Sequence, residues 1–194
     1  MKLQGGNFPM VNLNDLIKTY DNALSPEMCN ILIELYETNP TYHEKQEING
    51  NPLFTQFNFT DALNYSKDVE ALHRHVMLEI HRYMYDYFQH VDRRCFPLRY
   101  GFEELRIKKY KNDGKEKFHT HVDVKDYPSA KRFMAFMFYL NDVEEGGETA
   151  FTDLTIKPEA GKLLIFPPMW MYPHEGKAPI SNEKYLLSTY LHYV

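Results

Sequence analysis

The sequence has few of the features that mark secreted or membrane proteins. Only two cysteines, Cys29 and Cys95, occur among 194 residues, too few for a disulfide framework in a chain of this size. The first residues, MKLQGGNFPMV, lack the apolar run of a secretory signal, and no stretch approaches the roughly 20 apolar residues that cross a bilayer. We therefore expect a cytoplasmic protein with reduced thiols and no membrane partner.

An excess of positive charge is also missing. The chain has 22 Lys and Arg against 27 Asp and Glu, a formal net charge of −5. Proteins that bind nucleic acid backbones need a clear excess of basic residues, so we expect no nucleic acid partner and disfavour a nucleic acid demethylase. A local basic cluster between Arg106 and Lys117 is better explained as a solvated strand and turn, although it would also suit an acidic substrate.

What is present is enough material for one compact core. The hydrophobic share of 43%, the aromatic share of 15% and the charged share of 25% are those of an ordinary globular protein. Because domains run to roughly 100 to 200 residues, we expect a single domain over residues 1–194. Helices should support it over about 15–95, and a β-rich core should follow over about 96–194.

Two amphipathic helices are predicted in the first half of the chain. Ser25 followed by Pro26 resembles an N-cap with proline in the first helical position, which predicts a helix over 26–38. Apolar residues spaced three and four apart predict a second helix over 66–90. Residues 39–58 are rich in Asn, Pro and Thr, so we expect a loop with at most one edge strand, in a position where a lid over a substrate would be found.

After Phe96 the pattern changes to short β-branched and aromatic runs separated by turn residues. This alternation is typical of an all-β sandwich or barrel, which the helices would brace on one face. The predicted strands cover about 102–111, 119–124, 132–140, 148–151, 162–166 and 184–193.

The densest chemistry lies in the segment FHTHVDV. Residues two apart in a strand point to the same face, so His121 and Asp123 can present an imidazole and a carboxylate together, with His119 on the same face. His174 is the expected third ligand. Two histidines and one carboxylate leave positions open on an octahedral metal, as in non-haem Fe(II) oxygenases. Zinc is the rival metal, but closed zinc sites prefer cysteine, and Cys95 and Cys29 lie far from this segment.

A second set of residues would suit an organic acid bound beside that metal. Lys184 follows His174 by ten residues and shares a strand face with Ser188 and Tyr190. An ammonium group and a hydroxyl in an aliphatic pocket would hold a distant carboxylate. Each feature alone has a simpler explanation. With nine histidines in the chain, an H-x-D pattern arises easily by chance, and a lysine at a strand end usually reaches solvent.

Together these residues resemble the Fe(II)- and 2-oxoglutarate-dependent dioxygenases, and in particular their prolyl 4-hydroxylase branch, over roughly residues 17–193. His121-Val122-Asp123 matches the family's H-x-D, His174 its distal histidine, and Lys184 its 2-oxoglutarate-binding lysine. The segments RIKKYKNDGKEKFHTHVD and FMFYLNDVEEGGETAF also resemble the family, which places Tyr110 and Tyr139 beside the cosubstrate. The implied fold is mainly β, a double-stranded β-helix (jelly roll, cupin-like) with N-terminal helices packed outside.

The resemblance also implies a ligand set and a reaction. Fe(II) would bind His121, Asp123 and His174, and 2-oxoglutarate would chelate the iron while its far carboxylate meets Lys184. Hydroxyls such as those of Tyr110, Tyr139 and Ser188 would assist Lys184. O2 is then the co-oxidant, and ascorbate is the expected reductant. The product would be a hydroxylated aliphatic C–H position, with 2-oxoglutarate decarboxylated to succinate and CO2.

The substrate is expected to be a proline in a peptide or protein. A small-molecule hydroxylase, for example of a free amino acid, is the first alternative, and a metal-binding jelly roll without activity is the second. The stretch HEGKAPISNEKY departs from the pattern of collagen-type enzymes. With no peptide-binding module, secretory signal or retention tail seen in the sequence, a collagen-processing role in the secretory pathway is disfavoured. Aromatic and aliphatic residues over 133–138 would keep water from the iron, but for most of them the simpler explanation is the core of the sandwich. Trp170, between Pro168 and Pro173, is the exception and is expected to face substrate. No oligomeric state is predicted.

Overall fold

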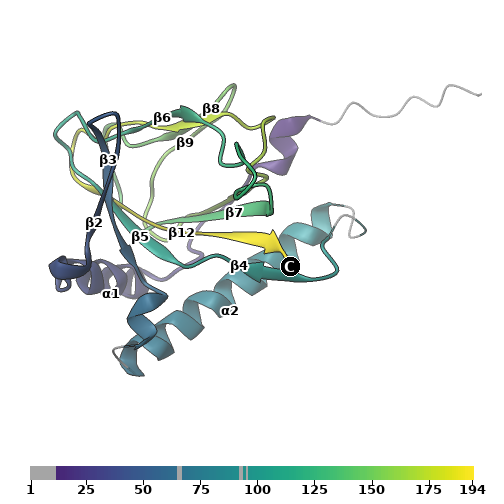
Figure 1. Cartoon of the computed structure of the whole chain (residues 1–194), viewed down its shortest axis with the longest axis horizontal. Helices are drawn as coiled ribbons and strands as arrows, with labels where there is room; N and C mark the ends of the chain where they lie inside the picture. The colour runs from purple at the N-terminus through teal and green to yellow at the C-terminus, as the bar shows by residue number, and fades with distance from the viewer. Residues whose placement is uncertain (1–11, 65–66, 92–93, 95) are drawn as a thin grey trace, which may run out of the picture.

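The computed structural model describes residues 12–64, 67–91, 94 and 96–194. Two antiparallel sheets face each other, and two helices, α1 (Pro26–Glu37) and α2 (Lys67–His90), lie beside the larger sheet (Figure 1). This is the predicted jelly roll with helices outside, and the fold prediction is confirmed. The first eleven residues of the predicted domain lie outside the described residues. Neither described helix is both long and apolar enough to span a membrane.

The larger sheet has the strand order β1-β10-β7-β12-β5-β3-β2, and β4 also pairs with β12. Its strands are β1 (Lys18–Tyr20), β2 (Glu44–Ile48), β3 (Asn51–Asn58), β4 (Tyr100–Phe102), β5 (Arg106–Tyr110), β7 (Arg132–Tyr139), β10 (Leu163–Phe166) and β12 (Lys184–Tyr193). The smaller sheet has the order β6-β11-β8-β9, with β6 (Phe118–His121), β8 (Thr149–Phe151), β9 (Thr155–Ile156) and β11 (His174–Gly176). All six predicted strands overlap observed ones, but β1, β3, β9 and β11 were not predicted as strands.

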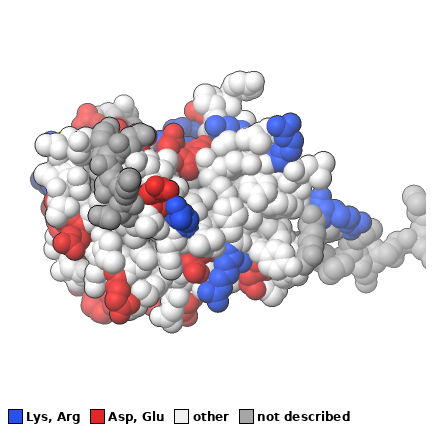
Figure 2. All heavy atoms as spheres, turned by 90° about the horizontal axis from the view of Figure 1, so that it is seen from below, with Lys and Arg blue, Asp and Glu red and all other residues white. Residues whose placement is uncertain are grey.

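Both helices form where the sequence predicts them. The Ser25 side chain accepts a hydrogen bond of 3.2 Å from the backbone N–H of Met28, and Pro26 occupies the first turn of α1, so the N-cap interpretation is confirmed. Helix α2 runs for 24 residues. The surface seen from the helix side has acidic and basic side chains interspersed, without a continuous basic patch on its described residues (Figure 2).

The prediction of a loop over 39–58 was wrong, but its single edge strand corresponds to β2, which ends the order of the larger sheet. Strands β2 and β3 form a hairpin, and β3 pairs with β5 to extend the larger sheet. Asn49 and Gly50 form its turn with φ of 53° and 77°, the left-handed conformation that two-residue hairpin turns require. The Asn-Gly pair was the overlooked signal. The segment is therefore a wall of the barrel, and a lid made from an irregular loop here is not supported.

The two faces of the larger sheet bury different cores. The outer face packs against the helices through apolar residues that include Phe57, Ile107, Phe136, Phe138 and Leu187. The inner face, toward the smaller sheet, carries Phe54, Tyr110, Tyr139, Leu164 and Leu186. Because side chains alternate along β7, only some residues over 133–138 face the barrel interior. Met134, Phe136 and Phe138 pack toward the helices, so the simpler explanation, that most of this run belongs to the core, holds for these three residues.

A short 3-10 segment, η1 (Leu13–Leu16), precedes the first strand. The Tyr87 hydroxyl of α2 donates to the carbonyl of Leu16 at 2.9 Å, and the Tyr172 hydroxyl donates to the carbonyl of Leu13 at 3.3 Å. Strand β1 follows directly and pairs with β10. The start of the described chain is thus tied to segments more than seventy residues away.

Candidate active site

Three potential metal ligands converge between neighbouring strands of the smaller sheet. His174 on β11 lies directly opposite His121 on β6, and Asp123 follows the end of β6. One Asp123 carboxylate oxygen lies 3.5 Å from Nε2 of His121, and the other lies 3.7 Å from Nε2 of His174. One ligand atom from each residue lies within 4.8 Å of the others. The structure therefore brings together the three residues that the sequence pattern selected.

Hydrogen bonds orient both imidazoles toward one point. Nδ1 of His121 donates to the carbonyl of His119 at 2.7 Å, and Nδ1 of His174 donates to the carbonyl of Tyr172 at 3.1 Å. A carbonyl can only accept, so each ring carries its proton on Nδ1 and leaves the Nε2 lone pair available. Nε2 of His121 is buried and lacks a hydrogen-bond partner within the described residues. An orphaned buried nitrogen of this kind fits a metal ligand.

His119 contributes through its backbone. Its side chain is exposed, and its carbonyl oxygen orients His121. The ring of Phe118 stacks on His121 with a centroid separation of 3.6 Å and covers one side of the imidazole. Phe166 and Phe151 cover His174 at 4.9 and 5.5 Å. The aromatic shelter that the sequence predicts therefore exists, but it comes from strands β6, β8 and β10.

The electrostatics favour the protonation states that bind a metal. Burial opposes ionisation of Asp123, but the nearby His121 and His174 and the hydrogen bond from Tyr190 outweigh it and lower the pKa of Asp123 to about 2. Burial holds the pKa of His174 below its ordinary value. At neutral pH the carboxylate is thus ionised and the His174 imidazole neutral, as metal coordination requires.

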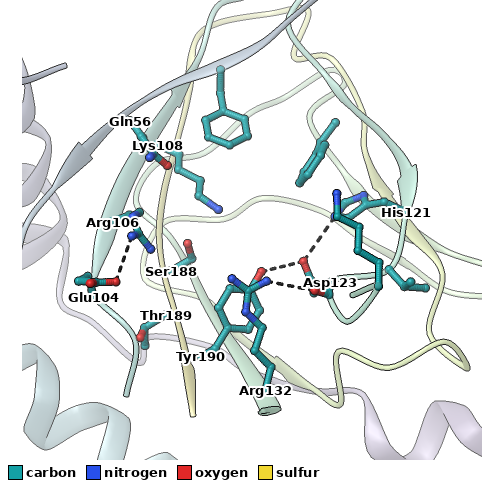
Figure 3. Close-up of a pocket in the computed structure, with 14 residues that line it drawn as sticks. Gln56, Glu104, Arg106, Lys108, His121, Asp123, Arg132, Ser188, Thr189 and Tyr190 are labelled. Carbon is teal, nitrogen blue, oxygen red and sulfur yellow. Dashed lines mark hydrogen bonds and ion pairs between the residues drawn. The ribbon is translucent and has the colours of Figure 1, made fainter. Parts of the chain in front are cut away.

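A polar network that the sequence did not reveal supports Asp123. The Tyr190 hydroxyl donates to Oδ1 of Asp123 at 2.7 Å, and Arg132 donates to the Asp123 carbonyl at 3.1 Å (Figure 3). Arg132 also pairs with both carboxylate oxygens of Glu103 at 2.9 Å and stacks on the Tyr190 ring at 4.0 Å. Tyr190 was recognisable from its place on the inner face of β12. Arg132 and Glu103 lie 29 residues apart, and no sequence pattern indicated that they would meet.

Lys184 begins β12 and is fully buried. Its ammonium group donates to the carbonyl of Gly147 at 2.9 Å and lies 4.3 Å from the centroid of the Tyr110 ring. Burial lowers the pKa of Lys184 to about 7. A Cβ added at Gly176 would lie 3.8 Å from this ammonium group, so the strand that carries His174 passes close by. A buried cation with one neutral partner is well suited to receive a carboxylate.

The other residues predicted to bind the cosubstrate lie in two different places in the barrel. Tyr110 and Tyr139 are buried near Lys184, where burial raises the pKa of both hydroxyls, and Tyr139 donates to Thr149 at 2.7 Å. Ser188 lies four residues along β12 from Lys184, about 13 Å at the usual rise of a strand. The two therefore lie at different depths of the barrel, and Ser188 shares a cavity with His121 and Asp123.

A cavity of about 330 Å³ opens beside the triad (Figure 3). It is lined by Phe54, Gln56, Glu104, Arg106, Lys108, Phe118, His121, Val122, Asp123, Lys125, Arg132, Ser188, Thr189 and Tyr190. The hairpin and β5 supply one wall. Trp170, which was expected to face substrate, is outside this lining and is 77% exposed. The stiffness of its proline-flanked segment does not turn the indole toward the site.

Comparison with protein families agrees with this geometry. Residues 105–192, which include the triad, match the model of the 2OG-Fe(II) oxygenase superfamily. The matched segment covers a little under half of the chain. The match supports a 2-oxoglutarate- and Fe(II)-dependent dioxygenase over a metal-binding protein without activity. The family implies Fe(II), 2-oxoglutarate and O2, and the triad fits the metal.

Solved structures with the same fold include several such enzymes. The viral collagen prolyl hydroxylase of Paramecium Bursaria Chlorella virus-1, in complex with 2-oxoglutarate, is 23% identical with a TM-score of 0.63, covering 92% of this chain and 96% of that chain. A Trichoplax adhaerens prolyl hydroxylase, bound to a hypoxia inducible factor peptide fragment, is 15% identical with a TM-score of 0.69 and coverages of 92% and 84%. The α-ketoglutarate-dependent epimerase SnoN from nogalamycin biosynthesis is 14% identical with a TM-score of 0.66 and coverages of 93% and 77%. Among curated proteins, none matches this sequence.

Proposed function

We propose that this enzyme hydroxylates proline in a peptide or protein, with Fe(II) on His121, Asp123 and His174 and 2-oxoglutarate on Lys184. One observation carries the assignment of these residues. Two imidazoles with free Nε2 atoms and one ionised carboxylate meet in the same barrel whose interior buries a lysine ammonium group. The first group suits the metal, and the second suits the far end of an organic diacid.

Bound Fe(II), 2-oxoglutarate and O2 supply the oxidation of a C–H bond, and 2-oxoglutarate leaves as succinate and CO2. The chain's own residues bind and orient these groups and keep water out of the site. The Lys184 ammonium group exchanges its hydrogen bond to Gly147 for the distal carboxylate, in a buried place where such charge-assisted bonds are strong. Tyr110 beneath it and Tyr139 beside it restrict the shape of this end of the barrel. Tyr190 and Arg132 hold Asp123 in one orientation.

A proline substrate is supported by the likeness to two prolyl hydroxylases, the viral collagen prolyl hydroxylase and the Trichoplax enzyme bound to a peptide fragment. A small molecule such as a free amino acid is the second candidate. The cavity of about 330 Å³ would enclose one, and the epimerase SnoN from nogalamycin biosynthesis shares the fold. Ascorbate as the reductant and a cytoplasmic location remain predictions from the sequence.

The test begins with anaerobic addition of Fe(II) and then 2-oxoglutarate, followed by the absorption band that arises when 2-oxoglutarate chelates Fe(II). His174→Ala is expected to abolish the band and Lys184→Met to shift its titration to higher 2-oxoglutarate concentration. Proline-containing peptides and free L-proline are then supplied with O2, and products are identified by mass spectrometry alongside succinate. A wild-type protein without the band would disprove the site assignment. Oxygen insertion into free amino acids only would replace the peptide substrate with the second candidate.

A further inference from the structure

The cavity beside the triad has an excess of positive charge that the protein itself leaves unpaired. Its lining includes four basic side chains, Arg106, Lys108, Lys125 and Arg132, but only two acidic ones. Glu104 pairs with Arg106 at 3.0 Å, and Glu103, just outside the lining, pairs with Arg132. The second acidic group of the lining, the aspartate of the triad, is committed to the metal site. The two lysines therefore remain without a carboxylate partner within the described residues.

Lys108 is the half-buried member of this pair, and Lys125 is exposed. It lies on β5 between Gln56 of β3 and Leu186 of β12, and its side chain extends into the cavity from the wall opposite His121 (Figure 3). Its ammonium group lies 5.1 Å from the centroid of the Phe54 ring. No hydrogen bond or ion pair joins this group to any part of the chain that the structure describes. Burial, aided by the nearby Arg106 and Arg132, lowers the pKa of Lys108 to about 8, although the negative charges of Asp123 and Glu103 oppose this shift.

The next residue shows what a structural lysine looks like in the same strand. Lys109 points to the outer face, where its ammonium group pairs with Glu37 at 2.9 Å and with Glu183 at 2.8 Å. Gln56, the neighbour of Lys108, donates a hydrogen bond from its amide to Glu44 at 2.9 Å and forms no hydrogen bond with Lys108 within the described residues. Partly buried lysines are normally paired, so the contrast suggests that a ligand supplies the missing anion.

A second polar group faces the same space. The Ser188 hydroxyl points into the cavity and forms no hydrogen bond to the residues described here (Figure 3). An ammonium group and a hydroxyl on adjacent strands together match the two oxygens of a carboxylate. Lys184, deeper in the barrel, is already positioned for the diacid. A separate anionic group on the substrate would therefore be the partner that Lys108 lacks.

We propose that Lys108, assisted by Ser188, binds a carboxylate of the primary substrate, so that the enzyme prefers acidic substrates. This inference rests on the proposed function and names its substrate class. In a peptide the carboxylate belongs to an Asp or Glu flanking the proline, and in a free amino acid it is the α-carboxylate. Lys108 is then a specificity residue of the substrate side, distinct from the cosubstrate lysine.

The experiment compares matched substrates on wild-type and variant enzymes. Proline peptides carry Glu, Gln or Lys at the positions flanking the proline, and free L-proline is compared with L-prolinamide. The wild type is expected to favour the Glu peptide about tenfold or more in kcat/KM, mainly through KM. Lys108→Met should abolish this preference, and Lys108→Glu should transfer it to the Lys peptide. Lys109→Met is the matched control and should leave the preference unchanged.

Substrate binding is scored separately, by the change in the absorption band of the anaerobic Fe(II) and 2-oxoglutarate complex when each compound is added. A stronger response to acidic compounds that depends on Lys108 supports the inference even if the hydroxylated product differs from the proposed one. Equal responses to Glu and Gln peptides and to L-proline and L-prolinamide would overturn it while leaving the proposed function intact. A loss of 2-oxoglutarate affinity in Lys108→Met as large as in Lys184→Met would also overturn it, because Lys108 would then serve the cosubstrate.

Discussion

The two faces of β12 have different roles within one strand of ten residues. Tyr185, Leu187 and Leu191 point outward into the apolar core beneath the helices. Lys184, Ser188 and Tyr190 point inward, to the buried cation site and the cavity. Because side chains alternate along a strand, the sequence of β12 serves stability on one face and chemistry on the other. Substitutions should therefore separate folding from ligand binding according to the face that they alter.

The largest effect is expected at the metal ligands that the inner face surrounds. Asp123→Ala should lower kcat by about a thousandfold or more, because the metal's contribution of several kcal/mol to the transition state is lost. Steady-state succinate release measures it, and circular dichroism should show a folded chain. Asp153→Ala, which removes an exposed carboxylate, is the control. Retained turnover in Asp123→Ala would contradict the assignment of this ligand.

The next effect concerns the buried cation. Lys184→Met should raise the Kd for 2-oxoglutarate by about a hundredfold to a thousandfold, because removing one partner of a buried charge pair costs about 2–5 kcal/mol. Titration of the Fe(II) absorption band measures it. Lys109→Met, on the outer face, should leave the Kd unchanged. If both variants weakened 2-oxoglutarate equally, the distinction between the two faces would fail.

On the outer face the effect should appear in stability alone. Leu187 is fully buried and lies between Phe138 and Ile107 in the sheet. Leu187→Ala should lower the free energy of unfolding by about 3 kcal/mol through lost burial and a new cavity. Urea denaturation measures this change. The Kd for 2-oxoglutarate should stay within about twofold, and a larger rise would mean that the faces are mechanically coupled.

The smallest effect is a pH dependence of the ligand-free protein. Lys184 has a pKa of about 7 in the folded state, lowered by burial, and an ordinary pKa near 10.4 when unfolded. Between these values the unfolded state binds more protons, so stability should rise with pH, by at most about 1.4 kcal/mol per unit from this group. Denaturation of wild type and Lys184→Met at pH 7 and 9 isolates the difference. Parallel pH profiles would show that Lys184 remains charged in the folded protein.

The sequence was most informative where the signal is local. The Ser25 and Pro26 start of α1, the H-x-D segment and the ten-residue step from His174 to Lys184 all depend on short spacings, and the structure shows each element or residue at the expected place. The hairpin was missed because the polar composition of its strands resembles a loop. Only its Asn49-Gly50 turn carried the contrary signal.

The remaining site depends on the order of strands in the sheet, which a single sequence does not encode locally. Arg132 and Glu103 meet because their segments are brought together over 29 residues. The basic cluster was interpreted as solvated, but pairing of β5 with β3 and β12 puts Lys108 inside the barrel and Lys109 outside. Alternation predicts that the two lysines differ, and only the sheet order decides which one is enclosed.

The fastening of η1 limits where the protein can be shortened. The hydroxyls of Tyr87 and Tyr172 each donate a hydrogen bond to a carbonyl of η1. Tyr172 lies two residues before His174, and its carbonyl orients the His174 imidazole. A chain trimmed to begin at residue 18 would remove the acceptors of both phenols, and with them a hydrogen bond that holds the segment before the distal metal ligand. Recombinant versions made for assays should therefore retain everything from Asn12 onward.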